Sequence, residues 1–218
     1  MIQAVIFDMD GVIIDSEKLW SNGITNVLAR HNVIYKQEIQ NLCMGKSLDE
    51  SSKILIDTHD LKISPEQLSD EKLNAVLELY KQKLDFMPGF LSLFESLKNR
   101  KVKMCIATAS NETLMNAVDA KLNLTNLFLG NVIFRTEKHN SKPAPDLFLD
   151  AASKLAIKPE DCVVIEDSPH GVKAALNAGM KVVALTSSTT TENLKGADLI
   201  VNSLDDINPS VIGLLGLI

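Results

Sequence analysis

Residues 4–16 of the chain read AVIFDMDGVIIDS, in which four apolar residues are followed by Asp8, Asp10 and Gly11. A short run rich in Val and Ile is typical of a strand that is buried on both faces of a parallel sheet. Two ionised carboxylates so close together repel each other, and each loses hydration where a strand leaves a core. The pair therefore needs a nearby cation or a proton on one member, and both arrangements indicate chemistry at the end of this strand.

Five further apolar runs extend this pattern along the chain. Helical spacing appears between them, and alternating strands and helices are the layout of parallel βαβ units. We therefore predict an α/β fold with a doubly wound parallel sheet. The runs are VKMCIAT (102–108), NVIF (131–134), CVVI (162–165), KVVAL (181–185) and DLIV (198–201), and one helical stripe between them is Leu147, Phe148, Ala151, Ala152 and Leu155.

The segment between the first two runs is too long for a single crossover helix. Residues 16–86 show helical spacing and no convincing strand, so we predict an all-helical cap domain at 16–86 inserted into a core domain of residues 1–15 and 87–218. Two pairs fit capping boxes, one of them with a proline at the first helical position. These are Ser47 with Glu50, and Ser64 with Gln67 after Pro65, while Leu73, Val76, Leu77, Tyr80 and Leu84 form an apolar stripe.

Composition restricts the class of partner. The 218 residues include 45% apolar residues and carry a formal net charge of −6, which leaves no basic face for nucleic acid or an anionic membrane. We expect a small-molecule ligand and a monomer. The three cysteines show no paired spacing, the four histidines are scattered, and the N-terminus does not resemble a signal peptide, so we expect a cytoplasmic protein without disulfides or zinc.

Polar residues follow four of the predicted strands. In an open parallel sheet, ligands bind beyond the carboxyl ends of the strands. Acids, a hydroxyl and a lysine that converge there would suit a magnesium ion and a phosphate, because the carboxylates supply oxygen ligands and the lysine neutralises phosphoryl oxygens. The residues are Asp8 and Asp10 after the first run, Thr108 at the end of the second, Lys142 in SKPAPD after the third, and Glu166 and Asp167 after the fourth.

Four motifs make the pattern specific. DMDGVIID, IATAS, SKPAPD and VIEDSPHG, in this order and spacing, resemble the four motifs of the haloacid dehalogenase superfamily. The resemblance covers essentially the whole chain, and the helical insertion is similar to the smaller cap of that superfamily. DSEKLW, MGKSLDES and NSLDDINP most resemble its branch of small phosphatases that includes pseudouridine-5'-phosphatase and 2-deoxyglucose-6-phosphatase, with β-phosphoglucomutase more distant.

The resemblance implies a role for each motif residue. Asp8 would be the nucleophile that forms an aspartyl phosphate, and Asp10 would protonate the leaving alcohol and later deprotonate the attacking water. Thr108 would donate a hydrogen bond to a phosphoryl oxygen, and Lys142 would neutralise both the phosphate and the nucleophile.

A magnesium ion is the implied cofactor. Its ligands would be the Asp8 carboxylate, the Asp10 carbonyl and Asp167, with Glu166 either a further ligand or a residue behind the ligands. Ser110 and Asn111 lie next to the phosphate site in the sequence and are expected to help bind substrate. Lys46, in the turn MGKS, either reaches the substrate or simply precedes the helix start at Ser47.

Each residue alone also has a structural interpretation. Thr108 or Ser110 could cap a helix, Lys142 could be a solvated loop residue, and Glu166 with Asp167 could begin a helix. A calcium loop of the EF-hand type is disfavoured because its glycine belongs at position six, whereas Gly11 is at position four. We expect Trp20 to pack in the first cap helix, with the cleft edge as an alternative, and His170 to lie at a helix start on the surface.

Three functions compete. A magnesium-dependent phosphatase of sugar or nucleoside phosphates fits all the motifs. A phosphohexomutase resembling β-phosphoglucomutase fits less well, because the cap histidine and arginine of that enzyme fall at Trp20 and Leu48 here. A phospho-aspartate receiver module is shorter, has no helical insertion and has no carboxylate at the position of Asp10. A dehalogenase would not need Asp10 or a metal.

Overall fold

The computed structural model describes residues 2–43, 47–207, 211 and 216. The chain divides into two compact units, which we call the core unit (residues 1–15 and 85–218) and the helical unit (residues 16–84). The core unit contains β1 (Ala4–Phe7), α5 (Phe90–Asn99), β2 (Lys103–Thr108), α6 (Glu112–Leu122), α7 (Leu124–Leu127), β3 (Val132–Phe134), α8 (Asp146–Leu155), β4 (Cys162–Glu166), α9 (Pro169–Asn177), β5 (Lys181–Leu185) and β6 (Leu199–Val201), with short 3₁₀ turns η1 (Pro159–Asp161), η2 (Thr191–Leu194) and η3 (Leu204–Asp206).

The six strands form one parallel sheet in the order β3-β2-β1-β4-β5-β6. The chain steps outward from β1 to β3 and then returns across the sheet to β4, so the direction of winding switches beside β1. Each strand coincides with one of the apolar runs. The predicted doubly wound α/β fold with an inserted helical segment is confirmed.

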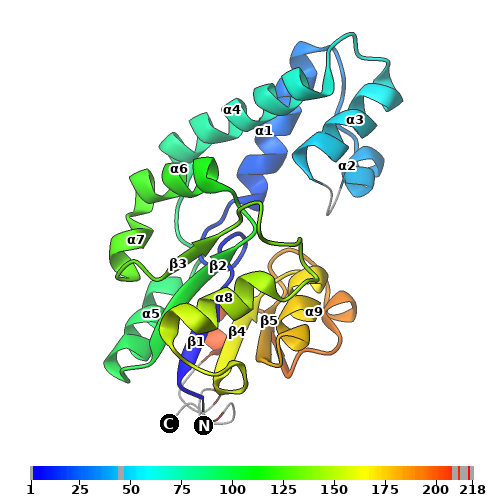
Figure 1. Cartoon of the computed structure of the whole chain (residues 1–218). Helices are drawn as coiled ribbons and strands as arrows, with labels where there is room; N and C mark the ends of the chain where they lie inside the picture. Colours follow the sequence, from blue (N-terminus) through cyan, green and yellow to red (C-terminus); the bar gives the residue numbers. More distant parts are fainter. Residues whose placement is uncertain (1, 44–46, 208–210, 212–215, 217–218) are drawn as a thin grey trace. The chain divides into compact units, whose positions relative to one another are not determined.

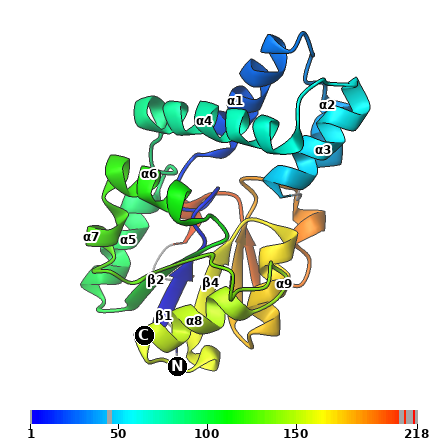
Figure 2. The same cartoon turned by 45° about the horizontal axis from the view of Figure 1, so that its top comes forward.

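Successive residues of β1 face opposite layers of helices, as the period of two in a strand requires. Ala4 and Ile6 are fully buried in the cluster that α8 and α9 complete. Phe7 points to the other face, where its ring meets the rings of Phe90 and Phe128 edge to face at centroid distances of 5.7 and 5.9 Å. Figures 1 and 2 both show α8 crossing in front of β1 and β4. Helices thus cover both faces of the sheet, so a binding site is expected at the ends of the strands rather than on a face.

The helical unit contains α1 (Glu17–Arg30), α2 (Gln37–Cys43), α3 (Leu48–His59) and α4 (Pro65–Lys83). Both predicted capping boxes are confirmed, with Ser47 at the start of α3 and Ser64 at the start of α4. Helices α1 and α4 approach closely at Gly23, where an added Cβ would lie 2.9 Å from the Val76 side chain.

The buried stripe of α4 differs from the predicted one at three positions. Val76 and Tyr80 are buried as expected, but Leu73 and Leu77 are only half-buried, and Lys72 has no exposed surface. The ammonium of Lys72 donates to Ser51 Oγ at 2.7 Å and to Ser52 Oγ at 3.1 Å, both near the start of α3. Burial lowers the pKa of Lys72 to about 8. A hydrophobicity pattern cannot predict a lysine at this position, because its acceptors come from another helix.

The ends of the insertion lie side by side in the core unit. Ile14 and Phe86 form an antiparallel bridge, Asp15 N donates to Asp85 O at 3.2 Å, and Met87 N donates to Ile13 O at 2.8 Å. In the described parts of the chain, no helix is long and apolar enough to cross a lipid bilayer.

Candidate active site

Lys142 is the centre of a buried charge cluster at the carboxyl ends of the strands. Its Nζ donates to Asp8 Oδ1 at 2.5 Å and to Glu166 Oε1 at 2.6 Å, and it lies 4.8 Å from the centre of the Phe148 ring. The side chain of Lys142 is 9% exposed, and the two carboxylate side chains are 8% and 1% exposed. The solvated-loop interpretation of Lys142 is therefore wrong.

The charges in this cluster shift one another's protonation. Burial raises the pKa of Asp8 to about 7, against the opposing effect of Lys142 and together with repulsion from Glu166. Burial disfavours the charged form of Lys142, but the two carboxylates outweigh it and raise the pKa of this ammonium above its ordinary value. The lysine therefore stays charged beside the predicted nucleophile.

Glu166 is the last residue of β4, and its carboxylate is fully engaged by the protein. Oε1 accepts from Lys142, while Oε2 accepts from the backbone N–H groups of Asp167 at 2.7 Å and Ser168 at 2.6 Å. Gly171, in the first turn of α9, leaves the space that this carboxylate fills, since an added Cβ would lie 1.6 Å from Oε1. These contacts favour the position behind the metal ligands for Glu166. The start of α9 is instead capped by Ser168, whose Oγ accepts from Gly171 N.

Asp167 packs against the turn that follows β1. Gly11 has a φ of +75°, which favours glycine, and an added Cβ there would lie 1.9 Å from Asp167 Oδ2. Burial, with repulsion from Glu166 and Asp8, raises the pKa of Asp167 to about 8. The glycine therefore lets the first and fourth motifs come into contact.

The end of β2 and the residues that follow it meet the same turn. Ser110 Oγ donates to Asp10 Oδ2 at 2.9 Å, and the fully buried Thr108 accepts a hydrogen bond from Ser110 N at 3.0 Å. Neither caps α6, because Asn111 does so through Leu114 N at 3.1 Å. The helix-cap interpretation of Thr108 and Ser110 is therefore wrong, and Asn111 has a structural function at this point.

Three further candidates fall elsewhere. Trp20 is half-buried in the helical unit and donates from Nε1 to the Tyr80 hydroxyl at 3.0 Å, as packing predicts. His170 is exposed at the start of α9. Lys46 lies outside the described residues.

Two serines after β5, which were not predicted from the sequence, belong to the cluster. Ser187 Oγ donates to Gly11 O at 2.7 Å and lies 3.2 Å from Asp167 Oδ2, and Ser188 Oγ donates to Asp167 O at 2.7 Å. Both follow the apolar run KVVAL, so their place at a strand end was a signal that could have found them.

The donor set suits a hard divalent cation. Asp8 and Glu166 share the ammonium of Lys142, and the buried Asp167 adds a third carboxyl group beside them. Such an excess of buried acid favours a bound cation with oxygen ligands. Within residues 2–43 and 47–207, no three His, Cys, Asp or Glu side chains form a metal-binding group.

Comparison with known proteins identifies the family. Residues 5–185 match the family model described as haloacid dehalogenase-like hydrolase. The chain belongs to this family. The predicted resemblance is confirmed, and so is the prediction of an enzyme of the phosphatase type, since relatives of this haloacid dehalogenase-like hydrolase are named phosphatases.

Three relatives of this hydrolase illustrate the similarity. A probable pseudouridine-5'-phosphatase from Drosophila melanogaster is 34% identical over 215 residues, which cover 96% of this chain and 93% of the relative. A phosphorylated carbohydrates phosphatase from Thermotoga maritima is 31% identical over 184 residues, with 83% of each chain covered. The crystal structure of a β-phosphoglucomutase from Clostridium difficile matches with a TM-score of 0.79 and 26% identity, covering 98% of this chain and 96% of that one.

Proposed function

We propose that this hydrolase is a magnesium-dependent phosphatase of small phosphorylated metabolites, namely sugar or nucleoside phosphates. The observation that carries the proposal is the contact between the buried Asp8 carboxylate and the Lys142 ammonium at the end of β1. A phosphate monoester is an anion, so it can approach a carboxylate nucleophile only where a fixed positive charge offsets the repulsion. The phosphatase names of the relatives support the same reaction class.

The chemistry proceeds in two displacements. An Asp8 oxygen attacks phosphorus, the bond from phosphorus to the ester oxygen breaks, and Asp10 gives its proton to the departing alkoxide. Water then attacks the aspartyl phosphate, Asp10 takes a proton from that water, and the bond from phosphorus to Asp8 breaks. Asp8 is regenerated as a carboxylate and inorganic phosphate leaves.

The neighbouring residues hold this arrangement. Ser110, through its 2.9 Å hydrogen bond, fixes the orientation of the Asp10 carboxyl group. Thr108 would donate a hydrogen bond from its hydroxyl to a phosphoryl oxygen, because it is the last residue of β2 and so lies at the same sheet edge. Lys142 would neutralise charge that accumulates on the phosphoryl oxygens in the transition state.

Asp8, Asp167 and the Asp10 carbonyl would hold the magnesium ion. When bound, the ion would supply positive charge that offsets the acids and stabilises the transferring phosphoryl group. Glu166 would hold Lys142 rather than the ion, since both of its oxygens already have protein partners. We further propose that the helical unit, together with residues 85 and 86, acts as the cap and selects the substrate.

A phosphohexomutase is the second candidate, and the similarity to a β-phosphoglucomutase structure favours it. A mutase must return the phosphoryl group to its substrate and must grip a second phosphate meanwhile. Trp20 and Leu48 offer no charge for that grip, and Trp20 is already paired with Tyr80. The phosphatase is therefore preferred.

Phosphate release from a panel of substrates tests the proposal. The panel contains pseudouridine 5'-phosphate, 2-deoxyglucose 6-phosphate, glycerol phosphate and β-glucose 1-phosphate, each with magnesium and with EDTA. We expect magnesium-dependent release, abolished by Asp8→Asn and unchanged by Asp57→Asn, which alters an exposed acid of α3. Isomerisation of β-glucose 1-phosphate with a bisphosphate primer, without net release, would establish the mutase instead.

A further inference from the structure

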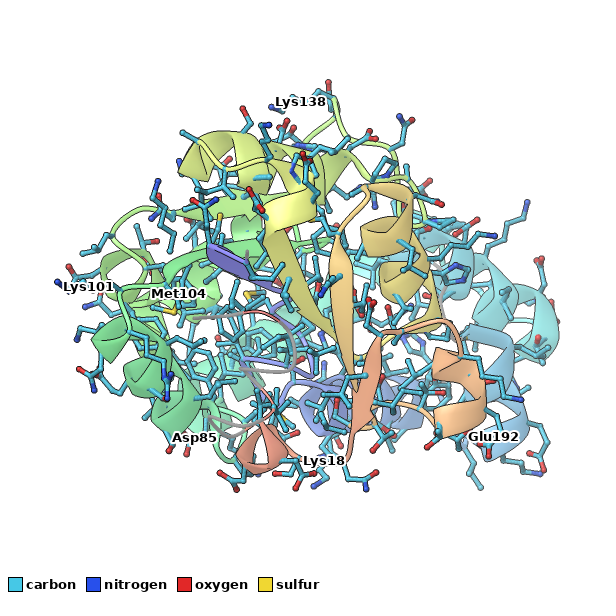
Figure 3. All side chains as sticks on the ribbon, turned by 90° about the horizontal axis from the view of Figure 1, so that it is seen from below. Lys18, Asp85, Lys101, Met104, Lys138 and Glu192 are labelled. Carbon is cyan, nitrogen blue, oxygen red and sulfur yellow. The ribbon has the colours of Figure 1, made fainter. Side chains whose placement is uncertain are left out.

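The loop between β3 and α8 carries Lys142 and is organised around a histidine. Residues 135–138, 140 and 141 are exposed, whereas His139 between them is only 7% exposed. Figure 3 shows the neighbouring Lys138 at the outer edge of this loop. A single buried imidazole in an otherwise exposed loop requires polar partners, because burying an unpaired polar group is costly.

The partners of His139 define its tautomer. Nδ1 lies 3.1 Å from the backbone N of Thr136 and 3.0 Å from Thr136 Oγ. A backbone N–H can only donate, so Nδ1 is the acceptor and the ring proton is on Nε2. That Nε2 lies 3.1 Å from Asp150 Oδ2, on α8, and donates to it. The neutral ring therefore ties the start of the loop to the helix that follows it.

Further side-chain contacts hold the loop directly before and after Lys142. Asn140 donates from its backbone N and from Nδ2 to Asp146 Oδ2, at 2.8 and 2.9 Å. Asn177 of α9 donates from Nδ2 to Pro143 O at 2.9 Å. This loop is not part of the sheet, so its side-chain contacts help to place the backbone of Lys142. They act together with backbone hydrogen bonds from Arg135 N to Ser110 O and from Ala144 N to Ser141 O, each of 3.0 Å.

We propose that His139 is a positioning residue that fixes the loop so that the Lys142 ammonium reaches Asp8 and Glu166. The inference rests on the proposed function of Lys142. A lysine side chain has four flexible bonds, and holding its backbone in place limits the conformations it must lose to make two short contacts of 2.5 and 2.6 Å. His139 contacts neither the reacting groups nor Lys142 in this arrangement, so it acts only through the loop.

Substitutions can separate this function from general stability. His139→Ala removes the contacts of the ring with Thr136 and with Asp150, and Asp150→Ala removes the acceptor on α8. Asp150→Asn is the conservative variant, because its amide oxygen still accepts from Nε2. Lys138→Gln removes only the exposed 2.7 Å ion pair of Asp150 and is the matched control, together with His170→Asn on the surface.

The first measurement is kcat for p-nitrophenyl phosphate or for the best substrate of the panel. We expect His139→Ala and Asp150→Ala each to lower kcat roughly 10- to 100-fold, as misplacement of a catalytic group by about 1 Å does. The double variant should be no slower than either single variant, and Asp150→Asn and both controls should remain near wild type.

The second measurement does not depend on activity. Lys142 and the exposed Lys101 are acetylated with sulfo-N-hydroxysuccinimide acetate and quantified by mass spectrometry. We expect Lys142 to be protected in the wild type and to react at least 10-fold faster in His139→Ala or Asp150→Ala, at temperatures where each variant is folded. Asp150→Ala keeps the test decisive if His139→Ala does not fold.

The outcomes distinguish the two proposals. Unchanged protection of Lys142 with unchanged kcat in folded variants overturns the function assigned to His139, whatever the wild type hydrolyses. Faster labelling of Lys142 in an enzyme that releases no phosphate supports the positioning by His139 and contradicts the phosphatase.

Discussion

Gly171→Ala should destabilise the protein, although alanine is the better helix former. Gly171 is the third residue of α9 and does not have a positive φ, so its backbone accepts alanine without strain. The obstacle is Glu166, since the new Cβ would lie 1.6 Å from Oε1 and 1.9 Å from the carboxyl carbon. The carboxylate must therefore move.

The magnitude follows from what Glu166 loses. Alanine in place of glycine contributes about 0.5–1 kcal/mol in a helix. Glu166 is 1% exposed and accepts three hydrogen bonds, from Lys142 and from the backbone of Asp167 and Ser168. Hydrogen bonds to a charged group contribute about 1.5–3 kcal/mol each. With about 2 kcal/mol for each of two lost bonds, less the gain from alanine, the net destabilisation is about 3 kcal/mol. In a chain of this size that lowers Tm by about 6–12 °C.

Urea unfolding followed by circular dichroism measures this effect, and a double-mutant cycle identifies its cause. His170→Ala, at the exposed neighbouring position, should change stability by less than about 0.5 kcal/mol. In a Glu166→Ala background the space is free, so Gly171→Ala should become neutral or stabilising by about 0.5–1 kcal/mol. The reasoning is refuted if the Gly171→Ala variant has the same free energy of unfolding as the wild type. It is also refuted if the substitution lowers that free energy equally in the wild-type and Glu166→Ala backgrounds.

Three further predictions concern other parts of the chain. Ser187→Ala removes the hydroxyl that joins Gly11 O and Asp167, so the Kd for magnesium by calorimetry should rise about 10-fold; an unchanged Kd contradicts this. The folded pKa of Lys72, lowered from 10.5 to about 8, means that the unfolded chain holds more protons between these values, so the unfolding free energy should rise with pH through this window, by up to about 3 kcal/mol. Lys72→Met should lack that rise in pH-dependent urea unfolding. Ser64→Ala should cost about 1 kcal/mol through loss of the cap on α4, measured by the same method, and Thr25→Ala, on the exposed face of α1, should not.

Buried parallel strands were predictable because each is a continuous apolar run that nothing else in a short sequence explains. CVVI and KVVAL correspond to β4 and β5, and the stripe predicted for α8 is the set of residues that this helix buries. The order of the strands needed the right-handed winding of βαβ units in addition to the pattern.

Side chains with distant partners were harder to predict. The buried ammonium of Lys72 donates to a serine of α3, and the hydroxyl of Ser187 donates to a carbonyl 176 positions earlier in the chain. His139 reads as one of four scattered histidines until the fold brings Asp150 beside it. In each case the partner is fixed by packing between elements, which local periodicity does not encode. Asp8 and Lys142, by contrast, follow strands, and parallel strands bring their carboxyl ends to one edge.

The antiparallel pairing of residues 13–15 with 85–87 means that the core unit meets the insertion as it would meet a hairpin turn. The entropy of closing a loop grows only with the logarithm of its length, so doubling the insertion would cost only about 0.6 kcal/mol more. Such a junction allows one inserted unit to be exchanged for another of different length while β1 and its aspartates stay in register. Since we propose that the helical unit selects the substrate, we expect that substrate preference can be changed by exchanging the residues between these two points.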